Sequence, residues 1–278
     1  MIHPVFKTGA RHLRDVLGVF DSHTLPPTFT QGWGFPVQHD QDVIQTQLSY
    51  YRERAGEYDE WFFRRGRYDR GAEHRAEWFR EIGTVESHLL PMVRDKEVVE
   101  FAAGTGLWTK RLLDAGACRI LAIDGSPEVL EINRARTSTD AVEYEIADVF
   151  AWNPTRVFDI VFFSFWLSHV PQSRFEAFWS MVRRSLRPDG QVLFVDSLLE
   201  QTSTATDHKA VDASGIAHRK LNDGREFQIV KVFHDPATLQ SRLAQLGWNG
   251  RVQSSGKFFL FGSMEIQADD TTPAISET

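Results

Sequence analysis

The sequence predicts an α/β fold in which helices cover both faces of a mostly parallel, seven-stranded sheet. Short apolar runs alternate with helical patterns from residue 97 to residue 196, and this alternation favours strands joined by crossover helices. A turn of small residues follows the first apolar run, and single acidic residues follow the next two. These observations predict a Rossmann-like, doubly wound fold with N-terminal capping helices and an inserted β-hairpin.

The segment before the sheet is predicted to be helical only in part. Residues 1–40 contain several Pro and Gly breaks and are expected to form an accessory segment that is partly disordered. Apolar residues at helical spacing predict a first helix over 42–63, broken near Gly56, and a second over 74–90. We interpret residues 42–90 as a helical lid on a domain that extends from 41 to 266.

The central part of the chain shows five apolar runs of strand length. Strands are predicted at 97–102, 119–124, 142–147, 159–165 and 191–196. A helix is expected to begin at Leu107, and a second at Pro127 with Ser126 as its N-cap. Phe175, Phe178, Trp179 and Val182 recur at helical spacing and predict a third helix before the fifth strand.

The region after the fifth strand is predicted to contain an insertion at 199–233. Residues 199–214 are polar and are expected to form a mobile loop, whereas Asn222-Asp223-Gly224 is a strong hairpin turn. A helix from Asp235-Pro236 to Gly247 and closing antiparallel strands within 252–266 should complete the domain. The polar residues 267–278 are expected to form a disordered tail.

Composition limits the classes of partner. The net charge of −7 argues against binding to a nucleic-acid backbone, and no apolar run is long enough to span a membrane. The single cysteine, Cys118, fits a reducing compartment. The ten histidines of the sequence show no metal-ligand spacing. We therefore expect a cytoplasmic protein, a monomer or homodimer, that acts on a small molecule without a metal.

The turn after the first strand has the features of a cofactor site. In the segment from Val98 to Gly106, small residues at the strand end let a ligand approach the backbone. Asp124 ends the second strand, where a carboxylate can accept both hydroxyl protons of a ribose. Asp148 follows the third strand and could accept from an adenine amino group. Each carboxylate taken alone could equally be a helix N-cap, but three such features on successive strand ends favour a nucleoside.

The residues of this turn favour a cationic cofactor over a dinucleotide. The three-glycine dinucleotide fingerprint is absent because Ala103 and Trp108 interrupt it. Glu100 inside the motif would repel a pyrophosphate, whereas it would suit a sulfonium with an α-amino group. S-adenosylmethionine is such a ligand, and S-adenosylhomocysteine would be the product. An NAD-dependent dehydrogenase is the weaker alternative.

These motifs resemble those of class I S-adenosylmethionine-dependent methyltransferases. Glu100-x-Ala102-x-Gly104-x-Gly106 matches their glycine-rich motif with alanine at the first small position. Asp124 matches their ribose carboxylate, and Asp148 matches their adenine-proximal acid. The motif positions and this resemblance assign the following residues to the cofactor: Tyr50, Tyr58, Glu100, Ala102, Ala103, Gly104, Thr105, Gly106, Trp108, Asp124, Gly125, Ser126, Asp148, Val149, Phe150 and Ser164.

Longer stretches resemble the phosphonate O-methyltransferases of dehydrophos biosynthesis. The matching stretches are Gln47–Ala55, Phe162-Phe163, Trp166–Pro171, Arg174–Trp179 and Ile229–Phe233. Residues 1–40 have no identified counterpart. The resemblance implies a lid helix that closes over the cofactor and an oxyanion as the group that is methylated.

The acceptor is expected near the end of the fourth strand. His169 could act as a base for a hydroxyl or amine, or could simply pack at a helix end. Tyr51, Phe165 and Trp166 could line the site or belong to the core. Arg225 and Lys231 are six residues apart, so strand alternation places them on one face. That face could bind a carboxylate or phosphonate, or could be solvated.

Three readings of function remain open from the sequence. The first is O-methylation of an anionic or hydroxyl group, and the second is N-methylation of a small amine. The third is a noncatalytic module that binds S-adenosylmethionine. Because an oxyanion is already ionised at pH 7, such an acceptor would depend on positioning more than on His169 as a base.

Overall fold

The computed structural model describes residues 37–208, 211 and 215–267. The expectations for residues 1–36 and for the tail from 268 onward lie outside the described residues. Helix α1 (Val37–Glu53) begins inside the segment 1–40 that the sequence assigned to an accessory region.

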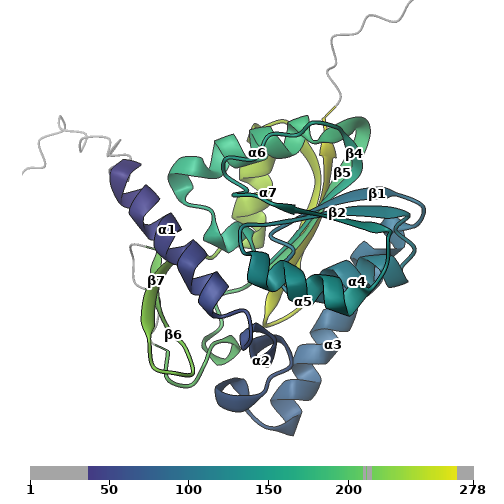
Figure 1. Cartoon of the computed structure of the whole chain (residues 1–278). Helices are drawn as coiled ribbons and strands as arrows, with labels where there is room; N and C mark the ends of the chain where they lie inside the picture. Colours follow the sequence, from purple (N-terminus) through teal and green to yellow (C-terminus); the bar gives the residue numbers. More distant parts are fainter. Residues whose placement is uncertain (1–36, 209–210, 212–214, 268–278) are drawn as a thin grey trace, which may run out of the picture. The chain divides into compact units, whose positions relative to one another are not determined.

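A single seven-stranded sheet forms the centre of the domain (Figure 1). Its strand order is β3-β2-β1-β4-β5-β9-β8, and the five strands from β1 to β5 pair in parallel. β9 lies antiparallel between β5 and β8. The strands are β1 (Glu97–Phe101), β2 (Arg119–Asp124), β3 (Val142–Ile146), β4 (Phe158–Ser164), β5 (Leu186–Ser197), β8 (Trp248–Ser254) and β9 (Phe259–Ile266). This architecture confirms the predicted fold class.

The strand order places a ligand crevice between β1 and β4. The chain winds outward from β1 to β3 and then returns to add β4 on the other side of β1. Ligands of doubly wound sheets bind at the carboxyl ends of the strands at such a reversal. The turn after β1 and the segment after β4 are therefore brought together, although 60 residues separate Glu100 from Ile160.

Two apolar clusters hold helices against the sheet. Because side chains alternate along a strand, neighbours on β4 point to opposite faces: Phe163 packs in the cluster with Trp179, and Phe162 packs in the cluster with Trp78. All four side chains are almost fully buried. The sheet-covering helices are α3 (Ala72–Leu89), α4 (Leu107–Asp114), α5 (Pro127–Thr137), α6 (Phe175–Arg184) and α7 (Pro236–Gln245).

The first two helices of the predicted lid (residues 42–90, called the lid below) lie with the hairpin outside this sheet (Figure 1). These helices are α1 and α2 (Tyr58–Phe62), with the predicted break near Gly56 between them. The hairpin pairs β6 (Ile216–Lys220) with β7 (Glu226–Val230) in antiparallel register. α1 packs along β7 and also touches α5. The hairpin turn at 222–224 lies where the sequence predicted it.

The described start of the loop after β5 is held in place by residues 61–64, whereas residues 199–214 were expected to form a mobile loop. Residues 209–210 and 212–214 of that loop lie outside the described residues. Residues Gln201–Ser203 form a 3-10 turn. Arg64 is fully buried and donates to the carbonyl oxygens of Thr202 at 2.7 Å and Ser203 at 2.9 Å. Trp61 Nε1 donates to the same Ser203 oxygen at 2.9 Å. Hydrogen-bond donors far away in the sequence therefore hold this polar segment in place. The residue pattern within the segment itself does not indicate such donors.

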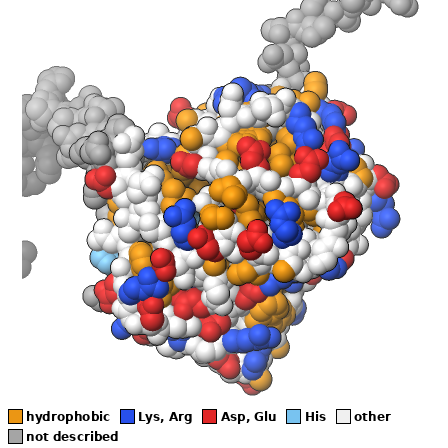
Figure 2. Space-filling view, viewed as in Figure 1, with side chains coloured by type: hydrophobic (Ala, Val, Ile, Leu, Met, Phe, Trp, Pro, Cys, Tyr) orange, Lys and Arg blue, Asp and Glu red, His pale blue; other side chains and the backbone are white. Residues whose placement is uncertain are grey.

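Two further properties concern the described residues. None of their helices is long and apolar enough to cross a membrane. Within the described ranges, no group of three His, Cys, Asp or Glu side chains is placed to hold a metal ion. Figure 2 shows acidic and basic side chains interspersed on the visible face of the domain rather than gathered by sign.

Candidate active site

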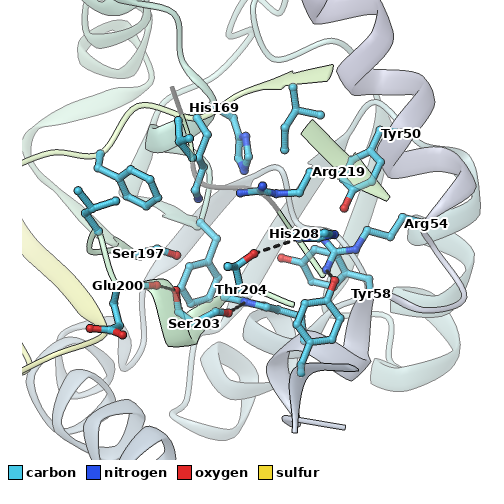
Figure 3. Close-up of a pocket in the computed structure, with 18 of the residues that line it drawn as sticks. Tyr50, Arg54, Tyr58, His169, Ser197, Glu200, Ser203, Thr204, His208 and Arg219 are labelled. Carbon is cyan, nitrogen blue, oxygen red and sulfur yellow. Dashed lines mark hydrogen bonds between the residues drawn. The ribbon is translucent and has the colours of Figure 1, made fainter. Parts of the chain in front are cut away.

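Two main cavities meet above the carboxyl ends of the parallel strands. The large cavity has a volume of about 450 Å³ and is bounded by the lid, the hairpin and the loop after β5 (Figure 3). The narrow cavity, about 70 Å³, lies over the ends of β1, β2 and β3. A small extension of about 20 Å³ runs along the turn after β1.

Four side chains border both main cavities. Tyr51, Tyr58, Phe165 and His169 line the large and the narrow cavity alike. We call these four residues the gate. A group transferred between ligands in the two cavities would have to pass between these four side chains. Three of the four, Tyr51, Phe165 and His169, were predicted to contact an acceptor, and Tyr58 was predicted to contact the cofactor.

The turn after β1 has a backbone that few side chains permit. Ala102, Gly104 and Gly106 all have positive φ angles, of 51°, 55° and 82°. A Cβ atom on Gly106 would lie 2.5 Å from Asn133 Oδ1, so this glycine is required both by its dihedral angle and by close packing. Ala102 and Gly104 line the narrow cavity, whereas Gly106 does not. Gly106 therefore shapes the turn from behind.

The predicted ribose carboxylate links two loops of the narrow cavity. Asp124 Oδ2 accepts from the Gly104 amide and Oδ1 accepts from the Ser126 amide, both at 2.9 Å. Burial raises the pKa of Asp124 to about 6. The N-cap of α5 is Ser126, whose hydroxyl accepts from Val129, so Asp124 is not that cap. Asp148 also lines this cavity, as the sequence predicted, and accepts from the Phe150 amide.

Glu100 lines none of the cavities, in contrast to its expected role opposite a cationic cofactor. Its side chain points from β1 towards α4, where Thr109 donates to Oε2 at 2.6 Å. It is fully buried and lines none of the three cavities. Burial raises its pKa to about 8, so the carboxyl group is mostly protonated at pH 7. Because side chains alternate along a strand, the Glu100 side chain points into the space between β1 and α4 rather than towards the cavities.

His169 is held by hydrogen bonds on both ring nitrogens. Nδ1 lies 2.7 Å from the Val230 carbonyl oxygen, which can only accept, so Nδ1 carries the proton. Burial lowers the pKa of His169 well below 6.5, so the ring is neutral at pH 7. Nε2 then accepts a hydrogen bond from the Tyr51 hydroxyl, with 2.7 Å between the oxygen and Nε2. The ring is therefore fixed in orientation and tautomer.

Buried cations line the large cavity next to His169. Lys231 Nζ donates to Ser168 Oγ at 2.7 Å and lies 3.8 Å from the buried Asp196 carboxylate. Burial lowers the pKa of Lys231 to about 8. Arg219 on β6 is 9% exposed and forms no ion pair with a carboxylate of the described residues. Figure 3 shows the Arg219 side chain extending into the cavity below His169.

Arg225 is not part of this cavity, so its prediction as a substrate contact is corrected. Its side chain is about half exposed and pairs with Glu53 and Asp223. The prediction assumed strand alternation from Arg225 to Lys231. However, β7 covers only Glu226–Val230, so both residues lie outside the regular strand. The buried hairpin arginine of the cavity is Arg219 instead.

The other predicted residues divide between the cavities. Gly125, Ser126, Val149, Ser164 and Trp166 line the narrow cavity, and Ala103, Thr105 and Trp108 line its extension. Tyr50, expected at the cofactor, lines the large cavity. Phe150 lines none of the three and packs against Trp166 with ring centroids 5.1 Å apart.

Sequence reasoning missed most of the far wall of the large cavity. Arg54, Tyr68, Ser203, Thr204, His208 and Arg219 all line it. The polar composition of the loop after β5 gave no signal of function. On the hairpin, the sequence favoured Arg225 beside Lys231, whereas the arginine that lines the cavity is Arg219.

Comparison with known proteins supports the same cofactor chemistry. A methyltransferase domain profile matches residues 98–190. DhpI in complex with SAH is 37% identical, with a TM-score of 0.65 over 82% of this chain and 99% of that chain. This chain belongs to the S-adenosylmethionine-dependent methyltransferase family. The structure of DhpI with SAM and HEP is 36% identical, with a TM-score of 0.64 over 80% of this chain and 97% of that chain.

A more distant structure shares only the fold with this methyltransferase. An S-adenosylmethionine-dependent methyltransferase from Mesorhizobium loti is 18% identical, with a TM-score of 0.51 over 66% of this chain and 97% of that chain. A search of curated protein sequences gives no match. The family and the cofactor therefore follow from DhpI and the domain profile together.

Proposed function

We propose that this methyltransferase transfers a methyl group to an oxygen of a small anionic acceptor, a phosphonate or a carboxylate. The main support is the pair of buried cations, Lys231 and Arg219, in the cavity beyond the gate. The sequence stretches that resemble phosphonate O-methyltransferases agree with it, as does DhpI, which was solved with SAM and HEP. We also propose that residues 42–90 act as the lid of this site and that 199–233 form its acceptor side.

The narrow cavity suits S-adenosylmethionine. Asp124 can accept ribose hydroxyls and Asp148 an adenine amino group, while Thr105 and Trp108 border the extension that an amino-acid end would enter. Bound here, the cofactor supplies an electrophilic methyl group. Ligand pockets usually measure about 300–1,000 Å³, so the narrow cavity must widen. Leu48 on α1 lines this cavity and packs so closely on Gly125 that an added Cβ would lie 2.9 Å from it, so we propose that α1 is the wall that shifts when the cofactor binds.

The residues around the acceptor position an oxyanion rather than activate it. Lys231 and Arg219 neutralise the acceptor and hold it in the large cavity, so that one oxygen faces the gate. His169 is neutral, and the lone pair on its Nε2 already accepts a hydrogen bond from the Tyr51 hydroxyl. An alcohol or amine would instead need the Tyr51–His169 pair to take up a proton. An anionic acceptor needs no such step.

The proposal is tested with two arginine variants from one hairpin. Arg219→Ala should raise the acceptor KM by at least tenfold, because a buried charge-assisted contact is lost. Arg225→Ala should leave it unchanged, because that side chain pairs with Glu53 and Asp223 outside the cavity. Steady-state kinetics with a phosphonate and a carboxylate acceptor measure both. Equal effects of the two variants would remove Arg219 from the site.

His169 distinguishes an oxyanion from a neutral acceptor. With an oxyanion, His169→Ala should slow single-turnover methyl transfer only modestly, because no proton has to be removed. A loss of several orders of magnitude with binding intact would show that the pair acts as a base. In that case the acceptor would be a hydroxyl or an amine.

A further inference from the structure

Arg54 is a buried cation that the proposed methyl transfer does not use. It follows α1, is 7% exposed and lines the large cavity. It forms no ion pair with any carboxylate among the residues that the structure describes. Its Nη2 donates to the Tyr68 hydroxyl at 3.1 Å, while its buried Nε has no hydrogen-bond partner in the described part of the chain.

Aromatic rings frame this guanidinium group. It lies over the rings of Tyr58, Tyr50 and Tyr68, at 4.9, 5.5 and 5.8 Å from their centroids. The buried Tyr50 hydroxyl also lacks a partner within the described ranges. Ring faces compensate a desolvated cation only in part, and a buried charge without a counter-ion is costly. The surroundings of Arg54 therefore favour an anionic ligand.

The large cavity has room for such a ligand beyond the methylated group. Its volume of about 450 Å³ falls in the range of pockets that hold whole drug-sized ligands. Tyr58 belongs to the gate, and its ring also contacts the Arg54 guanidinium group. Arg54 is therefore adjacent to the residues between which the methyl group would be transferred. Figure 3 shows Tyr50 and Arg54 reaching from the end of α1 towards the side of the cavity that holds His208.

We propose that the acceptor carries two anionic groups. One is methylated at the gate, beside Lys231, and the other is a carboxylate or a second phosphonate that binds Arg54. The planar fork of the guanidinium suits a carboxylate or phosphonate through two parallel hydrogen bonds. This inference rests on the proposed function for the first group, but the second group has its own site.

Two acceptors that differ by one charge test the inference by turnover. In 3-phosphonopropionate the far end is a carboxylate, and its amide has the same length without that charge. The wild-type kcat/KM should favour the carboxylate by about tenfold or more. Arg54→Met should bring the ratio close to one, and Arg54→Lys should retain part of it. Arg52→Met is the matched control, because Arg52 is half exposed on α1 and pairs with Glu128.

Binding separates this inference from the proposed function. Calorimetry on protein loaded with S-adenosylhomocysteine measures affinity for both compounds whether or not either is methylated. A preference for the carboxylate that disappears in Arg54→Met supports the second site even if no phosphonate is methylated. Equal affinities in the wild type, or a preference that Arg54→Met retains, would overturn it.

A thermal melt then excludes a purely structural role for Arg54. Replacing an unpaired buried charge by an apolar side chain of similar length is expected to leave the Tm unchanged or to raise it. An arginine needed for folding would give a lower Tm, and a lower Tm together with equal losses for both compounds would contradict the inference.

Discussion

Asp59, Thr105 and Arg136 form a contact between the lid and the glycine turn, which we call the clasp. This clasp gives the most specific prediction for cofactor binding. Asp59 on α2 accepts from the Thr105 hydroxyl at 2.6 Å and also pairs with Arg136 on α5. Arg136 donates in turn to the Thr105 carbonyl oxygen at 2.7 Å. The neighbour of Asp59, Tyr58, lines all three cavities. Asp59 should therefore hold the lid in place over the cofactor.

The magnitude follows from the exposure of the two charged side chains. Hydrogen bonds to charged groups contribute about 1.5–3 kcal/mol when buried. The side chains of Asp59 and Arg136 are 29% and 24% exposed, so solvent screens part of this. We expect Asp59→Asn to weaken S-adenosylmethionine binding by about 1–2 kcal/mol, or about 5–30-fold. The acceptor KM at saturating cofactor should change much less.

A double-mutant cycle by calorimetry measures this clasp. Asp59→Asn, Arg136→Met and the double variant should show losses that are clearly less than additive, because both changes break one contact. Asp114→Asn is the control, since its pair with Lys110 on α4 is exposed and remote from the cavities. Asp59 does not hold the lid over the cofactor if Asp59→Asn binds the cofactor as the control does, or if the two losses simply add.

Two further predictions concern acceptor binding and stability. Burial lowers the pKa of Lys231 from 10.5 to about 8, so its ammonium group is charged below pH 8. The kcat/KM for the acceptor should therefore fall as the pH rises through about 8. Lys231→Arg should abolish this fall, because arginine stays charged. A profile that is flat in the wild type would contradict this role. Gly106→Ala should lower the free energy of unfolding by about 2–4 kcal/mol, measured by urea denaturation, because of its positive φ and its contact with Asn133. Gly83→Ala, where a Cβ meets nothing within 4 Å, should not destabilise the protein.

The fold could be predicted because its signals are local. The alternation of strands and helices, the break near Gly56 and the hairpin turn at 222–224 each depend on neighbouring residues. The positions of Asp124 and Asp148 over one cavity also follow, since parallel strands end at the same edge of a sheet. These elements needed no knowledge of distant contacts.

The large cavity could not be predicted in the same way because distant segments build it. Arg64 and Trp61 fix the loop after β5 through its carbonyl oxygens, and no pattern within that loop indicates such donors. The prediction of Arg225 assumed strand alternation up to Lys231, but β7 covers only Glu226–Val230, so both residues lie outside the regular strand. Glu100 shows a related limit, because its motif indicated a ligand contact whereas its side chain lies beneath the turn.

The proposed function requires that an oxygen of an anionic acceptor receives the methyl group. The most direct measurement incubates the wild-type protein with methyl-labelled S-adenosylmethionine and matched small phosphonates, carboxylates and amines, and then identifies the labelled product by NMR. We expect label on a phosphonate or carboxylate oxygen, as a methyl ester. Label on an amine nitrogen, with none on the acids, would contradict it.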